Sequence, residues 1–252
     1  SERITNHELR ITPRLKAGTQ FNSPKWASAD RLLYRDGIQI SSKTIEAKVY
    51  SLSPSDASIL KAQLAFSQLL PKEHEHKRRI ASPKPNHASV VLWVELGNEI
   101  ILLGADLEDT SDSKVGWSAI LSSSTVTSEK ANVFKIPHHG SENAHHNDVW
   151  VKLLWSEPIA IVTPFRPGRR FLPSSEDIKR ITNLTSRAYA TAPAKQRRPR
   201  WNRGVVRDFA RQATRYVQEV DYGWGQVRLR KRMNQVGESW RVELFGEAYA
   251  LN

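Results

Sequence analysis

Two short segments of this sequence end in side chains that could bind a metal ion. An apolar run over residues 100–103 leads to Asp106, and a second strand-like run over residues 132–137 leads to His138 and His139. A buried strand that ends in a carboxylate or an imidazole holds that group rigidly at the surface, as a metal ligand must be held. Carboxylate oxygen and histidine nitrogen suit Zn²⁺ or Mn²⁺ at about 2.0–2.2 Å. Asp106, His138 and His139 are therefore candidate ligands, and the pattern leaves open which histidine coordinates.

Each of these residues also has an ordinary structural interpretation. An aspartate after an apolar strand often caps a turn or a helix, and a single histidine is often a hydrogen-bonded residue of the surface or the core. We favour the metal because both patterns occur together, on two strands that could be neighbours. For His145 and His146, in the loop that follows, a loop or helix cap is the first interpretation, and contact with a phosphate or a proton relay is the second.

The segments that carry these residues predict strands alternating with helices. Expected strands cover residues 45–52, 89–96, 99–103, 131–136, 159–163, 225–231 and 239–245, and expected helices cover 56–70, 117–124, 148–155 and a stretch from residue 174. Residues 15–21 and 31–40 are expected to be short strands or hairpin arms around Asp36-Gly37, a strong turn signal. This alternation predicts an α/β fold.

Length and composition restrict the class of protein. A chain of 252 residues fits one large domain or two small ones. We divide it into a mixed segment 1–44, a core 45–190 and a basic segment with a closing hairpin, 191–252. The lack of cysteine excludes disulfides and a thiolate zinc site. No apolar stretch is long enough to span a membrane and the start is no signal peptide, so we expect a cytoplasmic protein, with residues lost upstream of Ser1.

The formal net charge of +12 suits a polyanionic partner such as nucleic acid, although a basic surface can also serve solubility alone. Residues 195–215 concentrate this charge. The candidate nucleic-acid-binding residues there are Arg197, Arg198, Arg200, Trp201 and Arg203. Trp201 could stack on an unpaired base or lie buried at a domain edge.

The ordered motifs also resemble a known family. The sequence reads Asn86-x-x-Ser89-Val90-Val91, then Gly97-Asn98-x-Ile100 to Asp106, then Phe134-Lys135-Ile136-Pro137-His138-His139-Gly140-Ser141. This set is similar to the metallo-β-lactamase (MBL) fold, and more narrowly to the MBL-like domain of bacterial DNA-uptake competence channel proteins, over about residues 45–165. The resemblance implies a layered αββα sandwich, of which this chain holds the C-terminal half or most of it. It also implies Asp106 as a bridging carboxylate, His138 or His139 as a late ligand, and two Zn (or Mn) ions in the complete site.

The main histidine motif of that family, His-x-His-x-Asp-His, does not occur in this sequence, and His74-Glu75-His76 carries only its first letters. Asp106 with one or two histidines falls short of a full catalytic site. Either a missing N-terminal half or a second polypeptide supplies the other ligands, or the site has degenerated. The first option predicts a metal-dependent hydrolase, most simply a nucleic-acid phosphodiesterase (nuclease), with Asp106 and His139 as catalytic residues. The alternative is an inactive MBL-like module that binds nucleic acid or a partner protein, and hydrolysis of a small ester or lactam is a third option.

Overall fold

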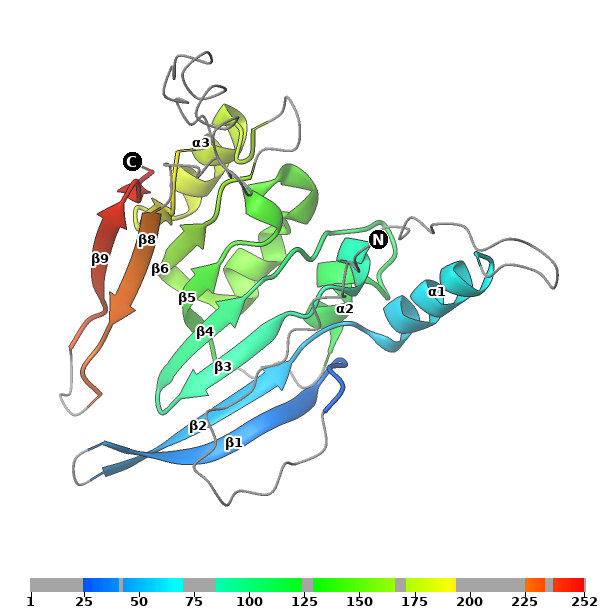
Figure 1. Cartoon of the computed structure of the whole chain (residues 1–252), viewed down its shortest axis with the longest axis horizontal. Coiled ribbons are helices and arrows are strands. Elements are labelled where there is room, and N and C mark those ends of the chain that lie inside the picture. The colour runs from blue at the N-terminus through cyan, green and yellow to red at the C-terminus, as the bar shows by residue number, and fades with distance from the viewer. Residues whose placement is uncertain are drawn as a thin grey trace, which may run out of the picture.

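The computed structural model describes residues 25–40, 43–69, 85–123, 129–165, 171–193, 225–233 and 238–251. They form an α/β fold built on one large mixed sheet of eight strands, with a separate two-stranded hairpin and few helices (Figure 1). The large sheet contains β1 (Arg31–Ile40), β2 (Lys43–Ser51), β3 (Leu92–Leu96), β4 (Glu99–Leu103), β5 (Ala131–Lys135), β6 (Leu154–Val162), β7 (Ala188–Ala190) and β10 (Tyr249–Ala250). The hairpin contains β8 (Gly225–Arg230) and β9 (Arg241–Gly246), and the α-helices are α1 (Asp56–Ser67), α2 (Gly116–Ser122) and α3 (Ser175–Leu184).

The strand order is β1-β2-β3-β4-β5-β6-β7-β10. The strands β1 to β4 are antiparallel neighbours, while β4, β5, β6 and β7 run parallel to one another. The carboxyl ends of parallel neighbours lie at the same edge of a sheet, which is where α/β proteins place their functional loops. The loops after β4 and β5, which carry Asp106 and the 138–139 pair, therefore start from the same edge.

One face of the large sheet is covered by helices and forms the core. A row of side chains across this face is almost fully buried from β3 to β7: Trp93, Leu102, Phe134, Ala160 and Ala188. Trp117 of α2 meets the Phe134 ring edge-on at 6.3 Å between centroids, and Trp150 meets the same ring at 5.3 Å. Trp150 belongs to a short π-helix, Val149–Leu153, that contacts α2 on this face.

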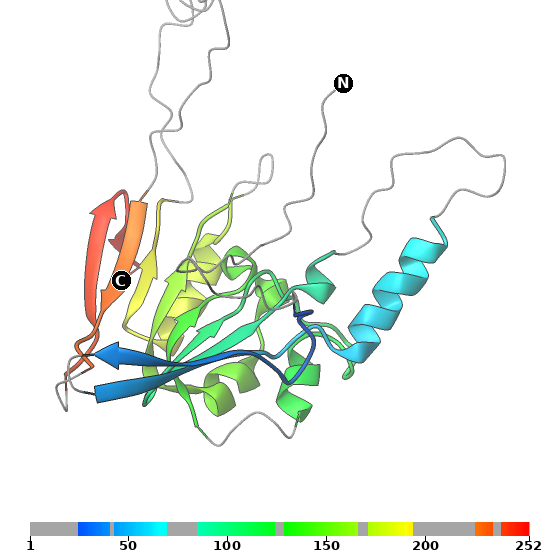
Figure 2. The ribbon, with the colours of Figure 1, turned by 60° about the horizontal axis from the view of Figure 1, so that its bottom comes forward.

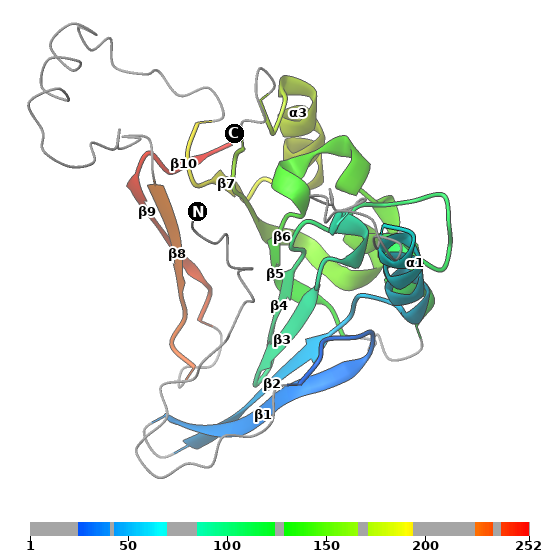
Figure 3. The same ribbon diagram turned by 45° about the vertical axis from the view of Figure 1, so that its right-hand side comes forward.

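The opposite face is also apolar but is covered less completely. Its corresponding row runs Tyr34, Val49, Val94, Ile101, Val133 and Ile159. The exposed fraction rises along this row from 0% at Ile159 and 3% at Val133 to 45% at Tyr34. The hairpin β8–β9 lies on this side, away from the helices (Figure 3). Glu99 at the start of β4 accepts hydrogen bonds from Lys231 and Trp240, which tie one end of the hairpin to the sheet.

Local sequence signals explain where the helices begin. Ser174 caps α3 through a capping box with Asp177, and Ser55 caps α1 by accepting from the backbone N–H of Ser58. The hairpin predicted around Gly97-Asn98 is present as β3–β4, with Gly97 at a positive φ of 59°. The hairpin predicted near the C-terminus is present as β8–β9.

Three expectations about secondary structure were wrong. Asp36-Gly37 does not form a turn, because β1 continues through both residues and pairs with β2 along its whole length. The helix predicted over 148–155 is shortened, because Leu154 already pairs with Ala131 and begins β6. The apolar face expected on α1 is not buried, since Leu60 and Leu64 stay exposed where this helix projects from the body (Figure 2).

The large sheet draws strands from all three segments into which the sequence was divided, with β1 from 1–44 and β10 from 191–252. Among the described residues, no helix combines the length and apolar character needed to cross a membrane.

Candidate functional site

The loops after β4 and β5 are in direct contact through their backbones. The N–H of Gly104 donates to the carbonyl of Lys135 at 3.0 Å, and the N–H of His138 donates to the carbonyl of Ala105 at 3.0 Å. Gly104 has no room for a side chain, since a Cβ there would lie 2.9 Å from the Lys135 oxygen and 3.0 Å from Pro137. The two loops therefore form one surface at the edge of the sheet.

Asp106 and His139 come together on this surface. The Oδ1 atom of Asp106 lies 3.9 Å from Nε2 of His139. The Nδ1 atom of His139 lies 2.7 Å from the carbonyl oxygen of Thr163, and since a carbonyl only accepts, Nδ1 carries the hydrogen. This leaves a lone pair on Nε2, on the side of the ring that faces Asp106. The Phe165 ring stacks on the imidazole at 4.7 Å and fixes its plane.

The backbone that presents His139 is strained. His138, His139 and Gly140 have positive φ angles of 41°, 57° and 78°, and Ala105 in the facing loop has 48°. Residues other than glycine seldom adopt positive φ angles, and those that do cluster at functional sites. The guanidinium of Arg180 stabilises the turn by donating from Nη2 to the Gly140 carbonyl at 2.7 Å.

His138 points to a different set of partners. Its Nδ1 lies 3.2 Å from Oε1 of Glu108, although no hydrogen bond of acceptable geometry joins them, and its Nε2 lies 3.4 Å from Nδ2 of Asn86. Glu108 also accepts from Asn86 at 2.8 Å and lies 3.6 Å from His87. The rings of His138 and His139 are 6.0 Å apart. Of the two histidines, His139 is the one that faces Asp106.

A positive charge lies near Asp106. The side chain of Lys135 is largely buried, and burial lowers the pKa of its ammonium group, while the nearby Asp106 carboxylate opposes that shift. The Nζ atom donates to the carbonyl of Ile136 at 3.2 Å. Sequence reasoning had not assigned a role to Lys135 or to Glu108, although Lys135 is three positions before His138 and Glu108 two positions after Asp106.

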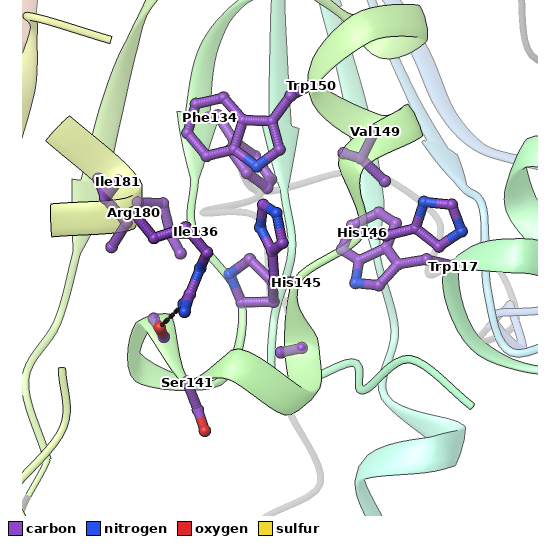
Figure 4. A pocket seen from close by; sticks show the side chains of 13 residues that line it. Trp117, Phe134, Ile136, Ser141, His145, His146, Val149, Trp150, Arg180 and Ile181 are labelled. Carbon is purple, nitrogen blue, oxygen red and sulfur yellow. Dashed lines mark hydrogen bonds between the residues drawn. The ribbon is translucent and has the colours of Figure 1, made fainter. Parts of the chain in front are cut away.

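His145 and His146 line a small cavity beside the turn that contains Gly140 and Ser141 (Figure 4). The Nε2 atom of His145 bonds to Asn147 at 2.8 Å, and Nδ1 of His146 accepts from the backbone N–H of Asp148 at 3.1 Å. Burial lowers the pKa of His145, and the Arg180 charge adds to this shift. These contacts hold the loop in shape, and contact with a phosphate, the second interpretation given above, stays a prediction.

Asp106 and His139 would supply two ligands, whereas a catalytic zinc needs about three from the protein. In the parts of the chain that the structure describes, no group of three or more His, Cys, Asp or Glu residues is arranged to hold a metal ion. Arg197, Arg198, Arg200, Trp201 and Arg203 lie outside the described residues, as do His74 and His76.

Comparison with known proteins gives no further assignment. No protein-family model, no curated protein and no solved structure matches this chain.

Proposed function

We propose that this chain is part of a metal-dependent phosphodiesterase of the MBL type, and that Asp106 and His139 are two ligands of its metal centre. The observation that supports this proposal is the 3.9 Å separation of Asp106 Oδ1 and His139 Nε2. The hydrogen bond from Nδ1 to the Thr163 carbonyl adds to it, because it fixes the tautomer that a metal ligand requires. An Asp and a His present hard and borderline donors, the set that suits Zn²⁺ or Mn²⁺.

A bound metal would supply hydroxide near neutral pH by lowering the pKa of a coordinated water. The residues of this chain have separate tasks. Asp106 and His139 hold the ion, Thr163 and Phe165 fix the imidazole, and Lys135 places a positive charge beside the site, where an anionic phosphodiester would be bound.

The proposal includes a second polypeptide segment that completes both the ligand set and an αββα sandwich. The apolar row from Tyr34 to Ile159 gives this segment a surface to pack on. Val94 of β3 and Ile101 of β4 in this row are only partly buried, whereas Trp93 and Leu102, which face the helices, are buried. Sheets that are apolar on both faces are normally covered on both. A layer of aliphatic side chains packed here, beside β8–β9, would end near Asp106 and could bring further His or Asp ligands.

Nucleic acid is the substrate class that the charge favours. The net charge of +12 gives an electrostatic attraction for a polyanion without sequence preference. We expect binding to single-stranded or double-stranded nucleic acid to weaken steeply with salt. Binding that stays flat as the salt concentration rises would contradict this choice of substrate.

A cleavage assay tests the proposal. The longest natural polypeptide containing this sequence is incubated with Mn²⁺ or Zn²⁺ and either a fluorescent oligonucleotide or bis(p-nitrophenyl) phosphate. We expect metal-dependent cleavage that Asp106→Ala and His139→Gln abolish. Asp36→Ala is the matched control, since Asp36 lies on β1 at the edge of the sheet and its carboxylate bonds only to Tyr34 and Gly37 among the described contacts. Equal cleavage by the Asp106 variant and the wild type would refute the role of this carboxylate.

A non-catalytic role in binding nucleic acid or a partner protein is the second candidate. The charge of Lys135 favours it, because an ammonium group that interacts with the Asp106 carboxylate already offsets the negative charge of that group. This role predicts that Asp106→Ala leaves nucleic-acid binding unchanged and that the wild type does not cleave the oligonucleotide when either Mn²⁺ or Zn²⁺ is added.

A further inference from the structure

A cavity lies beside the turn that contains Gly140 and Ser141 (Figure 4), and its lining residues do not include Asp106 or His139. It is lined by aromatic and aliphatic side chains of β5, α2 and the π-helix, together with Ser141, His145, His146 and Arg180. Its volume of about 10 Å³ is room for one water-sized group. Ser141, His145 and His146 are partly exposed and form its mouth, whereas Trp117 lies at 0% exposure in its depth.

Two buried N–H groups of this cavity lack an acceptor. The indole Nε1 of Trp117 and the guanidinium Nε of Arg180 are inaccessible to solvent and have no hydrogen-bond partner. Leaving a buried donor unsatisfied costs about 1–3 kcal/mol, so such groups in native proteins usually have a partner, a water or a ligand. In the view of Figure 4 the two side chains lie on either side of His145.

Arg180 cannot satisfy its Nε by turning. Its Nη1 is held by Oδ1 of the buried Asp177 at 2.7 Å, and its Nη2 donates to the Gly140 carbonyl at 2.7 Å. Asp177 belongs to α3, as Arg180 does, and Gly140 belongs to the turn that presents His139. These two contacts fix the plane of the guanidinium, so its Nε–H is held in place.

The other polar groups of the cavity also favour an acceptor from outside. The Nδ1 atom of His146 accepts a backbone N–H, so the hydrogen of the neutral ring lies on Nε2, which is a further donor. Among the described residues that line the cavity, Arg180 is the one with a permanently charged side chain, and Asp177 at 2.7 Å pairs with that charge.

We propose that this cavity binds a compact oxyanion of the carboxylate or phosphate class. One oxygen enters and accepts from the Trp117 indole N–H, and Arg180 contributes its free Nε–H. The size of the cavity excludes anything bulkier than a single oxygen at this depth, so the rest of the ligand lies at the mouth beside Ser141 and His146. The site is separate from the Asp106–His139 pair and does not depend on cleavage of a phosphodiester.

The indole N–H of Trp117 provides a direct test. The full chain is labelled with ¹⁵N-tryptophan, which gives one indole resonance for each of its 8 tryptophans, and Trp117→Phe assigns the relevant one. Formate and inorganic phosphate are titrated in separate series at constant ionic strength, with chloride as the balancing anion. We expect the Trp117 resonance to shift and saturate with at least one oxyanion, and the formate and phosphate series distinguish the carboxylate from the phosphate source.

Two variants keep the test sharp. Trp155→Phe is the control, because Trp155 is exposed on β6 and does not line the cavity, and its removal should leave the titration unchanged. Arg180→Lys retains a positive charge but loses the Nε–H, and should weaken the binding at least tenfold. If Trp117→Phe fails to fold, the proposal is still tested by whether an indole resonance of the wild type shifts with the oxyanion and whether Arg180→Lys loses that shift. A Trp117 resonance that does not respond to either oxyanion means a bound water only, and would overturn the proposal.

Discussion

Gly104→Ala should separate the two loops that bring Asp106 and His139 together. An added Cβ would lie 2.9 Å from the carbonyl oxygen of Lys135 and 3.0 Å from two carbons of Pro137. Neither neighbour is a flexible side-chain end, and the Lys135 carbonyl also accepts the Gly104 N–H, so the backbones themselves must move apart. Overpacking of this kind costs about 1–3 kcal/mol. In a chain of this size each kcal/mol shifts the melting temperature by about 2–4 °C, which gives a decrease of roughly 2–12 °C.

Thermal unfolding followed by circular dichroism measures this change, and Gly37→Ala is the matched control. A Cβ at Gly37 would lie 2.8 Å from the methyl group of Thr44, but Thr44 is exposed, and water can replace its hydrogen bond to Gln39 when the side chain turns. The control should therefore stay within about 0.5 kcal/mol of the wild type. Metal uptake by Gly104→Ala should also fall, because the carboxylate and the imidazole move apart. An unchanged melting temperature for Gly104→Ala would mean that the two loops are not in contact as described.

Three further changes have defined outcomes. Phe134→Ala removes a ring that is 2% exposed and contacted edge-on by two tryptophans, and should cost about 3–5 kcal/mol in urea unfolding. Ser174→Ala removes the side chain that caps α3 and should cost about 1 kcal/mol in the same assay. Replacing an exposed serine that caps no helix should leave the stability unchanged. Burial lowers the pKa of His145 in the folded state below its usual 6.5. As the pH falls below 6.5, the imidazole is therefore protonated in the unfolded chain before it is protonated in the folded one. The free energy of unfolding then decreases by at most about 1.4 kcal/mol per pH unit. His145→Asn should reduce that loss between pH 7 and pH 5, and an identical pH dependence in the variant would contradict it.

The parts of the fold with a local cause were predictable from the sequence. Gly97-Asn98 between two apolar runs predicted the β3–β4 hairpin, and Ser174 before Glu176 and Asp177 predicted the start of α3. Asp36-Gly37 carried the same kind of local signal, and there the prediction was wrong. The pairing of β1 with β2 along its full length outweighs the turn preference, and such pairing is a property of two segments together.

The sequence could not predict which of His138 and His139 faces Asp106, because nothing in the adjacent pair distinguishes one ring from the other. Thr163 of the segment after β6 accepts from His139, while Glu108 and Asn86, from two other loops, surround His138. The left-handed turn at 138–140 then directs the two rings toward different partners. The positions of these contacts in space follow from the parallel order β4-β5-β6, which the sequence did not specify.

Diffraction from crystals soaked in millimolar Mn²⁺ or Zn²⁺, recorded at the absorption edge of the metal, tests most directly whether Asp106 and His139 bind one ion. We expect an anomalous peak about 2.0–2.2 Å from both the Asp106 carboxylate and Nε2 of His139, with Nδ1 still bound to the Thr163 carbonyl. A map with no peak between these two side chains, or with the ion bound at His138 and Glu108 instead, would contradict this account of the site.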